Sequence, residues 1–446
     1  MNINKFCLTT LMVLCLATFS SAEDARWPSW RGPLATGIIP DGNPPITWSE
    51  TENIQWKIEL TGDGSNSTPV IWGDKLIYQN AVKTDKQKSQ TETPTPTPQP
   101  AAQGGRRSGR GASPTNYYRF NLICRNRHTG ALIWSKTVAE VVPQQGHHAD
   151  HGFVSFSPIT DGQHIWANFG PQGLHCYDLD GNAKWKIELG PYNVRSGFGP
   201  GGSLALIDDM IIVVKDHEDQ SFIVALNKDS GQEIWKKLRD EPSAWTTPLA
   251  VTVQGQTQIV VNGHNRVLAY HASNGDVIWE STGQTLNVIP TPVLSDDMIF
   301  CASGFRGSKL QAIKLGRTGK LTGTDAIVWE VDKNTPYVPS PLCYQNRVYV
   351  CSVSTQRISC FDAPTGKAHY TNESLPEVKG IYASPIGVAG HVYFVGRNGV
   401  TAVLKNADSL DVVATNTLDD KIDCSPVVIG DTLYLKGKKN LYCIAE

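Results

Sequence analysis

The chain has 446 residues, of which 40% are hydrophobic and 18% are charged, with 40 Gly and 27 Pro. Its 40 Lys and Arg residues stand against 42 Asp and Glu residues, giving a formal net charge of −2, and this balance argues against nucleic acid or an anionic membrane as the partner. A charged fraction below the roughly 25% of an average soluble domain, combined with many turn residues, is typical of an exported all-β protein.

The first predicted element is a secretory signal peptide at residues 1–22. Lys5 precedes the apolar stretch CLTTLMVLCLA, and the small residues SSA come just before Glu23, which is the pattern of a cleavable signal. No other apolar run approaches the roughly 18 residues that a membrane-spanning helix requires. We therefore expect a periplasmic or extracellular protein without a transmembrane segment, in which residues 23–52 form an N-terminal extension that packs on the main domain.

Residues 53–446 contain an internal repeat. Its first phrase is Ser/Thr-Pro followed by a turn and a β run, as in TPVLSDDMIFCAS and SPLCYQNRVYVCS. The copies begin at Thr68, Ser157, Ser203, Thr247, Thr291, Ser340, Ser384 and Ser425, and the Ser203 copy has Leu204 in place of proline. Four short β runs per period of roughly 40 to 50 residues predict a blade of a β-propeller.

A second phrase alternates with the first and carries an aromatic residue after a glycine turn. The aromatic residues are Trp134, Trp185, Trp235, Trp279, Trp329 and, in the sixth copy, Tyr370. We expect each Trp to pack between neighbouring blades, with its indole N–H donating to a carbonyl of the next blade. The Trp residues are therefore interpreted as structural.

The two ends of the repeat region predict how the ring closes. A lone strand, NIQWKIEL at residues 53–60, precedes the first copy, and the last copy stops after three strands at NLYCIAE. Pairing the lone strand with the incomplete last blade removes exposed sheet edges. The prediction is an eight-bladed propeller whose N-terminal strand completes the C-terminal blade.

A low-complexity insertion at residues 83–115 interrupts the first blade. It is rich in Pro, Thr, Gln and Gly and cannot bury a core, so we expect it to be disordered. Arg106, Arg107 and Arg110 either contact an acidic polymer or partner, or belong to a solvated linker.

The stretch PQQGHHADHGF places several possible metal ligands upstream of the second blade. Three interpretations stay open: a zinc, copper or nickel site made by His147, Asp150 and His151; a contact with a polar ligand or partner; and a solvated or internally hydrogen-bonded loop. The stretch is not assigned catalytic residues, because loops around a ring bring such side chains together by chance.

Propeller topology predicts which residues surround the mouth of the central channel. The links that lead to the innermost strands and the loops between second and third strands emerge on one face, where binding most often occurs. The residues expected at this mouth are Asn66, His147, His148, Asp150, His151, Arg195, Trp245, Asn287, Tyr337, Tyr382 and Asp423.

Cys351 and Cys360 flank a predicted turn at similar distances. They could face each other across a hairpin and form a disulfide in an oxidising compartment. Burial of both as reduced thiols is the alternative.

The turn-and-strand unit TG-x-x-x-W and the opening WPSWRGPLATGI resemble exported PQQ-like (quinoprotein-type) repeat proteins, and the resemblance covers residues 53–446. It implies an all-β, eight-bladed β-propeller of PQQ-like repeats. The repeat is also similar to that of the propeller lipoprotein of the outer-membrane β-barrel assembly machine, a docking scaffold without cofactor. Since fold alone does not decide activity, the resemblance leaves the chemistry open.

Quinoprotein dehydrogenases of this fold hold their quinone between an indole and a disulfide of adjacent cysteines, with a calcium ion on carboxylate and amide oxygens. This sequence has no Cys-Cys pair and little chain beyond eight minimal blades. The expectation is therefore no cofactor, with PQQ or a divalent metal as the alternative. In function we expect an exported, monomeric, non-catalytic propeller that binds a protein or polymer ligand through the channel mouth; the alternative is a quinone- or metal-dependent oxidoreductase using the same funnel.

Overall fold

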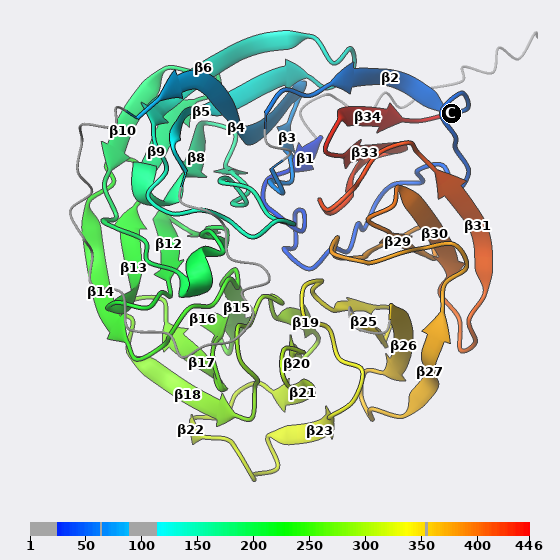
Figure 1. Cartoon of the computed structure of the whole chain (residues 1–446). Helices are drawn as coiled ribbons and strands as arrows, with labels where there is room; N and C mark the ends of the chain where they lie inside the picture. Colours follow the sequence, from blue (N-terminus) through cyan, green and yellow to red (C-terminus); the bar gives the residue numbers. More distant parts are fainter. Residues whose placement is uncertain (1–24, 63–64, 89–113, 353–355) are drawn as a thin grey trace, which may run out of the picture.

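The computed structural model describes residues 25–62, 65–88, 114–352 and 356–446, in which eight β-sheets stand as blades around a central axis (Figure 1). The predicted eight-bladed, all-β propeller is confirmed. The predicted signal peptide lies outside the described residues. Two short 3-10 helices, η2 (Gly170–Gln172) and η3 (Arg195–Gly197), are the helices of the described part. Neither has the length or apolarity of a membrane-spanning helix.

The first four blades follow one another along the chain. Blade 1 contains β1 (Arg26–Trp27), β3 (Val70–Trp72), β4 (Lys75–Gln87), β5 (Asn116–Asn126) and β6 (Leu132–Val141). Blade 2 contains β7 (Ile159–Thr160), β8 (His164–Asn168), β9 (Leu174–Asp178) and β10 (Ala183–Ile187). Blade 3 contains β11 (Ala205–Ile207), β12 (Met210–Lys215), β13 (Ser221–Asn227) and β14 (Glu233–Arg239). Blade 4 contains β15 (Leu249–Val253), β16 (Gln256–Asn262), β17 (Arg266–His271), β18 (Val277–Thr282) and the added β22 (Gly319–Lys320).

The remaining four blades complete the ring. Blade 5 contains β19 (Val293–Ser295), β20 (Met298–Ser303), β21 (Lys309–Lys314) and β23 (Ile327–Val331). Blade 6 contains β24 (Leu342–Tyr344), β25 (Arg347–Ser352), β26 (Arg357–Asp362) and β27 (Ala368–Ser374). Blade 7 contains β28 (Ile386–Val388), β29 (His391–Val395), β30 (Val400–Lys405) and β31 (Val412–Thr417). Blade 8 contains β32 (Val427–Ile429), β33 (Thr432–Lys436), β34 (Asn440–Ile444) and β2 (Ile54–Glu59).

Blade 8 is built from both ends of the repeat region, as predicted. Strand β2 pairs antiparallel with β34, with Trp56 opposite Cys443 and Ile58 opposite Leu441. The Leu60 N–H extends this contact by donating to the Lys439 carbonyl at 2.7 Å. The ring is thus closed by strand pairing between segments almost 400 residues apart in the chain.

The repeated Ser/Thr residues form a closed ring of hydrogen bonds around the axis. Just before each innermost strand, the backbone N–H of one blade donates to the Ser or Thr hydroxyl of the next blade at 2.9–3.3 Å. The participants, in chain order, are Thr68, Ser157, Ser203, Thr247, Thr291, Ser340, Ser384 and Ser425, and the Ser425 N–H returns to Thr68. The most regular motif of the sequence therefore joins the blades to one another.

Replacing Ser384 with alanine is expected to lower the free energy of unfolding by about 1–3 kcal/mol, because the buried Ser340 N–H would lose its acceptor. Ser384→Thr is the matched control, since threonine already serves in the same role at Thr291. Denaturant or thermal unfolding measures the difference. Equal stability of the alanine and threonine variants would contradict the structural role of the ring.

Trp side chains seal the junctions between blades. The indole N–H groups of Trp56, Trp134, Trp185, Trp235 and Trp329 each donate to a carbonyl of the following blade at 2.8–3.0 Å, which confirms the predicted contact at these junctions. The turn glycine of the following blade lies against the indole: at Gly366, with φ +70°, a Cβ atom would come within 2.6 Å of Trp329. This close approach explains why glycine and Trp recur together.

Trp279 departs from the predicted pattern. Its N–H donates to Gln258 Oε1 of its own blade at 3.2 Å, so the expectation of a bond to the next blade is wrong here. The physical reason is β22, which reaches back from the connection between β21 and β23 and pairs in parallel with β18, with Gly319 opposite Trp279. Leu321 then packs in the same core cluster as Trp279.

The segment before β2 runs across the centre of the ring and then along blade 7 to reach blade 8 (Figure 1). Strand β1 pairs with the innermost strand of blade 1, and Ile38 bridges to Gly387 of blade 7. The buried Arg31 guanidinium donates to the carbonyls of Thr36, Pro341 and Pro385 at 2.5–2.9 Å. Burial lowers the pKa of Arg31. The segment thus ties blades 1, 6 and 7 together at the axis.

Two expectations need correction. The predicted disordered insertion at residues 83–115 begins too early, because β4 continues through Lys83 to Gln87 and pairs there with Asn116 of β5; residues 89–113, with Arg106, Arg107 and Arg110, lie outside the described residues. Of the two alternatives for Cys351 and Cys360, the disulfide is wrong and the burial of both as reduced thiols is confirmed. The hairpin register pairs Cys351 with Ile358 and Cys360 with Tyr349, and both cysteines are buried free thiols.

Candidate functional site

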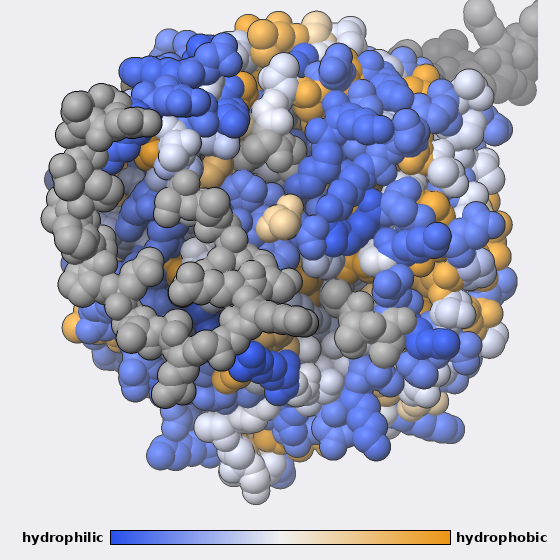
Figure 2. Space-filling model, viewed as in Figure 1, coloured by the Kyte–Doolittle hydropathy of each residue, from blue (hydrophilic) through white to orange (hydrophobic). Residues whose placement is uncertain are grey.

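The mouth face is the face that carries the links to the innermost strands and the loops between the second and third strands. Hydrophilic residues predominate on the side of the molecule seen in Figure 2. Large exposed apolar side chains lie mainly on the outermost strands, such as Leu132 on β6 and Leu238 on β14. Any recognition at the mouth therefore depends chiefly on polar and charged side chains.

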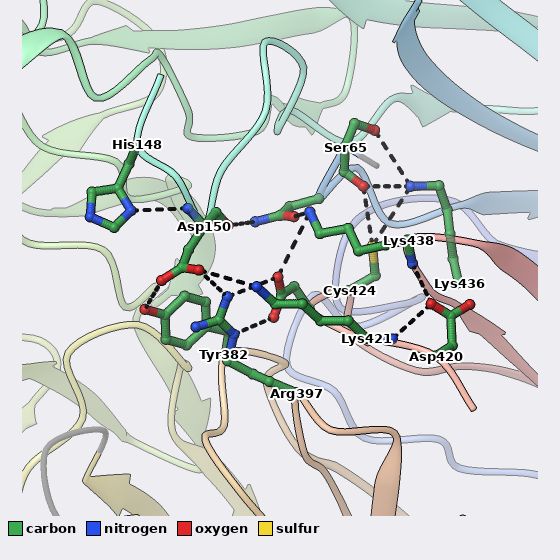
Figure 3. Close-up of polar contacts among 12 residues, drawn as sticks. Ser65, His148, Asp150, Tyr382, Arg397, Asp420, Lys421, Cys424, Lys436 and Lys438 are labelled. Atoms are coloured by element: carbon green, nitrogen blue, oxygen red, sulfur yellow. Dashed lines mark hydrogen bonds and ion pairs between the residues drawn. The ribbon is translucent and has the colours of Figure 1, made fainter. Parts of the chain in front are cut away.

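Asp150 is the centre of a polar cluster at the mouth (Figure 3). Its Oδ1 accepts from Arg397 Nη2 at 2.7 Å and from Lys421 Nζ at 3.1 Å, and the Tyr382 hydroxyl donates to its Oδ2 at 3.3 Å. The Arg397 guanidinium also lies 3.8 Å from the centre of the Tyr382 ring. Asp150 comes from the link between blades 1 and 2, whereas its partners come from blade 7 and the links that flank it.

Asp423 and Asn66 extend the cluster. Asp423 is almost fully buried and accepts from Arg397 Nε at 2.7 Å, while Lys438 Nζ lies 3.7 Å from its Oδ2. Lys438 also donates to Asn66 Oδ1 at 2.6 Å, and Asn66 Nδ2 donates to the Asp150 backbone carbonyl at 3.3 Å. The Asp150 cluster is the set formed by Asn66, Asp150, Tyr382, Arg397, Lys421, Asp423 and Lys438.

The electrostatics favour the charged forms of Asp150 and Arg397. The hydrogen bond from Arg397, with support from Lys421, holds the pKa of Asp150 well below its usual range. Burial opposes the charge on Arg397, but its hydrogen bonds to Asp150 and Asp423 outweigh burial and raise the pKa of this guanidinium. Burial also raises the pKa of Tyr382 to about 12, so at neutral pH this hydroxyl acts as a donor.

A buried lysine lies beside the cluster. Lys436 is 2% exposed, and its Nζ donates to the Ser65 carbonyl at 2.6 Å and lies 3.8 Å from Cys424 Sγ. The Cys424 thiol in turn contacts the carbonyls of Ser65 and Ser67 at 3.7 and 3.6 Å. This group fastens blade 8 to the link that enters blade 1 (Figure 3).

The histidine loop, residues 147–151, combines the outward contacts of Asp150 with hydrogen bonds inside the loop. His147 Nδ1 donates to the His148 carbonyl at 2.8 Å, and the Asp150 N–H donates to His148 Nδ1 at 3.2 Å. The buried Nδ1 of His151 has no hydrogen-bond partner in the described structure, and burial together with the neighbouring His147 lowers the pKa of His151 to about 3.

The predicted metal ligands are not assembled. Asp150 points to the cations of blade 7 and its flanking links, whereas His147 and His148 bond within the loop. Across the described ranges, no group of three or more His, Cys, Asp or Glu side chains is placed to hold a metal ion. The interpretation of His147, Asp150 and His151 as a ligand set therefore gains no geometric support.

Three further predicted mouth residues form a second group. Arg195 Nη1 lies 3.5 Å from Asn287 Oδ1, and the Asn287 side chain also interacts with Tyr337. The Tyr337 ring stacks on Phe305 with centroids 5.0 Å apart. Trp245 belongs to neither group. Its side chain is only 9% exposed, and its N–H donates to the Gly199 carbonyl at 2.8 Å, which indicates a structural role.

Sequence reasoning missed the three cations of the Asp150 cluster. Arg397 lies in the loop between β29 and β30, and Lys438 lies in the loop between β33 and β34. Lys421 lies in the link between blades 7 and 8. A signal was present, because the loops GRNG and GKKN join second to third strands and so emerge on the mouth face.

Two open depressions lie on the rim of the same face, each of about 560 Å³. His217, Glu218 and Asp219 help to line the first, and His264 and Arg266 help to line the second; Asp240 and Pro242 line both. Neither is lined by residues of the Asp150 cluster. The cluster is the stronger candidate because separate blades direct charged groups to one point there.

The residues at the mouth do not fit a quinone with a calcium ion. The carboxylates that could bind calcium, Asp150 and Asp423, are already paired with Arg397, Lys421 and Lys438. Trp245 is engaged with the Gly199 carbonyl, and the sequence has no pair of adjacent cysteines. A divalent cation would have to displace these basic side chains.

Comparison with known proteins gives one family and several structures. A family model described as outer membrane protein assembly factor BamB matches residues 119–367 and 220–445. No curated protein sequence matches the chain.

The solved structures that resemble this fold include the following three. BamB from Moraxella catarrhalis is similar with a TM-score of 0.57 and 14% identity, over 87% of this chain and 98% of the other. The computationally designed Ika8 protein has a TM-score of 0.53 and 9% identity, over 86% of this chain and 98% of the other. A quinohemoprotein alcohol dehydrogenase, ADHIIG from Pseudomonas putida HK5, has a TM-score of 0.58 and 10% identity, over 94% of this chain and 80% of the other. At such identities these likenesses concern the fold alone.

Proposed function

Because the chain belongs to the family described as outer membrane protein assembly factor BamB, we propose that it is an exported, non-catalytic β-propeller that binds a protein ligand through its mouth face. The observation that carries the proposal is the Asp150 cluster, in which links and loops of several blades bring Arg397, Lys421 and Lys438 to one partly exposed position. Charged groups of this kind steer and orient a partner.

Export and a monomeric state are parts of the same proposal. The signal pattern at residues 1–22 supports passage to the periplasm or the cell exterior. Closure of the ring within one chain supports a monomer, since blade 8 is completed by the chain's own β2. Light scattering of the purified mature protein is expected to give the molar mass of a single chain, and a multiple of that mass would contradict the monomer.

The test compares the mouth face with the opposite face. A photocrosslinking residue placed at Lys379 or Lys439, exposed positions of the mouth face next to the Asp150 cluster, is expected to give a discrete protein adduct in the native host, and an excess of unmodified protein should suppress it. Asp209 and Asp297, in turns between first and second strands, are the matched controls. Adducts that form equally at Asp209 and Asp297, or there alone, would refute binding through the mouth.

An oxidoreductase that uses quinone or a metal is the second candidate, favoured by the fold shared with the quinohemoprotein alcohol dehydrogenase. The mouth residues weigh against this candidate, because Asp150 and Asp423 are paired with basic side chains and do not form a calcium site. Absorption spectroscopy and elemental analysis of protein purified from its native source decide the matter. A stoichiometric quinone chromophore, or a stoichiometric metal that is lost in His147→Ala and His151→Ala variants, would contradict the binding-only function.

A further inference from the structure

The positive charges of the Asp150 cluster outnumber the negative ones. Arg397, Lys421 and Lys438 face Asp150 and Asp423. Asp423 is a buried, permanent partner of Arg397, because its side chain is 1% exposed and accepts from Arg397 Nε. The Asp150 side chain is 30% exposed. Without Asp150, the three cations would face one carboxylate, and an anion would be needed at the position that Asp150 now fills.

Asp150 is supplied by a loop with few ties to the blades that it contacts. Residues 147–151 form no strand or helix, and apart from the contacts that Asp150 receives from the cluster their hydrogen bonds run largely within the loop. A further bond joins the His148 N–H to the Phe198 carbonyl, on the side of the loop away from blade 7. The carboxylate of Asp150 thus provides the main link to Tyr382, Arg397 and Lys421.

The cluster contacts two parts of the same aspartate. Tyr382, Arg397 and Lys421 bind the carboxylate, and Asn66 Nδ2 donates to the backbone carbonyl of Asp150. Lys438 donates to Asn66 Oδ1, which turns the amide nitrogen toward that carbonyl. A site that binds a carboxylate and a neighbouring peptide carbonyl is suited to an aspartyl residue in a polypeptide. A simple anion such as phosphate offers negatively charged oxygens but no peptide carbonyl.

We propose that Asn66, Tyr382, Arg397 and Lys421 form a binding site for an aspartate-containing acidic segment of a protein partner, and that Asp150 occupies this site until such a segment displaces it. This inference rests on the proposed function and specifies the chemistry of the partner. Asp150 acts as a built-in competitor, so the apparent affinity for the segment is the intrinsic affinity reduced by the fraction of molecules in which the site is open.

The experiment measures binding of a short fluorescein-labelled Asp-Gly repeat peptide to the full mature chain by fluorescence anisotropy at low ionic strength, where charge contacts are least screened. Asp150→Asn is expected to bind about tenfold more tightly than the wild type, because its neutral side chain competes less well for the cations. Asp150→Ala provides a second open variant. Thermal unfolding of each variant confirms that the propeller is intact.

Two controls separate the site from a general effect of charge. Asp419→Asn removes one negative charge from a neighbouring position whose side chain is 89% exposed and pairs with Lys439, and it should leave the affinity unchanged. Adding Lys421→Gln to Asp150→Asn should abolish the gain. The Asn-Gly peptide should bind none of the variants.

The proposal is overturned if Asp150→Asn and Asp419→Asn increase the affinity for the Asp-Gly peptide equally, or if neither Asp150→Asn nor Asp150→Ala increases it. It is also overturned if the increase in Asp150→Asn persists after Lys421→Gln is added. Inorganic phosphate that displaces the peptide as effectively as unlabelled Asp-Gly peptide would instead indicate a general anion site and overturn the peptide assignment. These failures leave crosslinking at the mouth untouched. Loss of crosslinking at the mouth, with peptide binding retained, would refute the proposed function alone.

Discussion

Replacing Trp56 with alanine is expected to lower the free energy of unfolding by about 3–5 kcal/mol, the range for truncating a large aromatic side chain in a core. Trp56 lies on β2 and packs against Tyr434 with ring centroids 6.0 Å apart. Its N–H donates to the Arg127 carbonyl of blade 1 at 3.0 Å. The indole therefore holds blade 8 to blade 1 at the junction where no covalent link connects the outer strand to the rest of its sheet.

Trp235→Ala is the matched control for this prediction. Trp235 makes the same bond, to the Ala272 carbonyl at 2.8 Å, between blades 3 and 4. Unfolding should cost a similar free energy in both variants, but only Trp56→Ala should increase proteolytic cleavage between residues 40 and 60, because β2 can detach without unfolding the other blades. A small loss of stability in Trp56→Ala, or unchanged cleavage in this segment, would contradict closure by β2.

Arg239→Ala is expected to destabilise the protein by about 3–5 kcal/mol, the usual cost of removing one partner of a buried ion pair. Arg239 Nε and Nη2 donate to the two oxygens of Asp216 at 2.8 and 2.9 Å, and both side chains are 1% exposed. A further short hydrogen bond joins Arg239 to the Tyr270 hydroxyl of blade 4. Burial opposes the charge on Arg239, but Asp216 outweighs it and raises the pKa of the guanidinium.

Two comparisons check this assignment by thermal or denaturant unfolding. The double variant Asp216→Leu/Arg239→Met should recover much of the loss, because no charge is left buried without a partner. Lys237→Ala, on the same strand, removes an exposed pair with Asp276 and should have little effect. A double variant as unstable as Arg239→Ala would show that packing, and not the unpaired carboxylate of Asp216, causes the loss.

The internal repeat allowed the fold to be predicted from the sequence much more fully than the candidate site. The phrase that begins at Thr68 and returns at Ser425 encodes both the innermost strand and the hydrogen bond to the next blade, so counting copies counted blades. The closing strand was predictable because Trp56 carries the same signature as Trp134. These features depend on local pattern and on symmetry, and a sequence displays both.

The departures arise where symmetry is broken. The position of Trp279 could not be foreseen, because β22 is an addition to one blade. The choice between a disulfide and free thiols depended on the strand register: Ser352 pairs with Arg357, which sets Cys351 opposite Ile358, two residues short of Cys360. Arg31 gave no signal either, since two of its three carbonyl partners, Pro341 and Pro385, are more than 300 positions away.

At the mouth, the sequence identified the face but not the pairings. Asn66, Asp150, Tyr382 and Asp423 were expected there and lie in one cluster, whereas Arg195, Asn287 and Tyr337 lie in another. Which links and loops contact one another depends on how far each extends toward the axis. That extension is set by side-chain contacts between blades that are distant in the sequence. Arg397 and Lys438 were not predicted because they lie in the loops GRNG and GKKN and not in the links, whereas Lys421 lies in a link and carried no distinguishing signal.

The hydroxyl–amide ring has a direction. Every N–H in it points to the blade that follows in the chain, including the step from Ser425 to Thr68. Each blade therefore presents the same donor on one side and the same acceptor on the other, so a copied or deleted repeat would meet its new neighbour with matching groups. Gene duplication could lengthen or shorten such an array without designing a new junction, because every junction uses the same donor and the same acceptor.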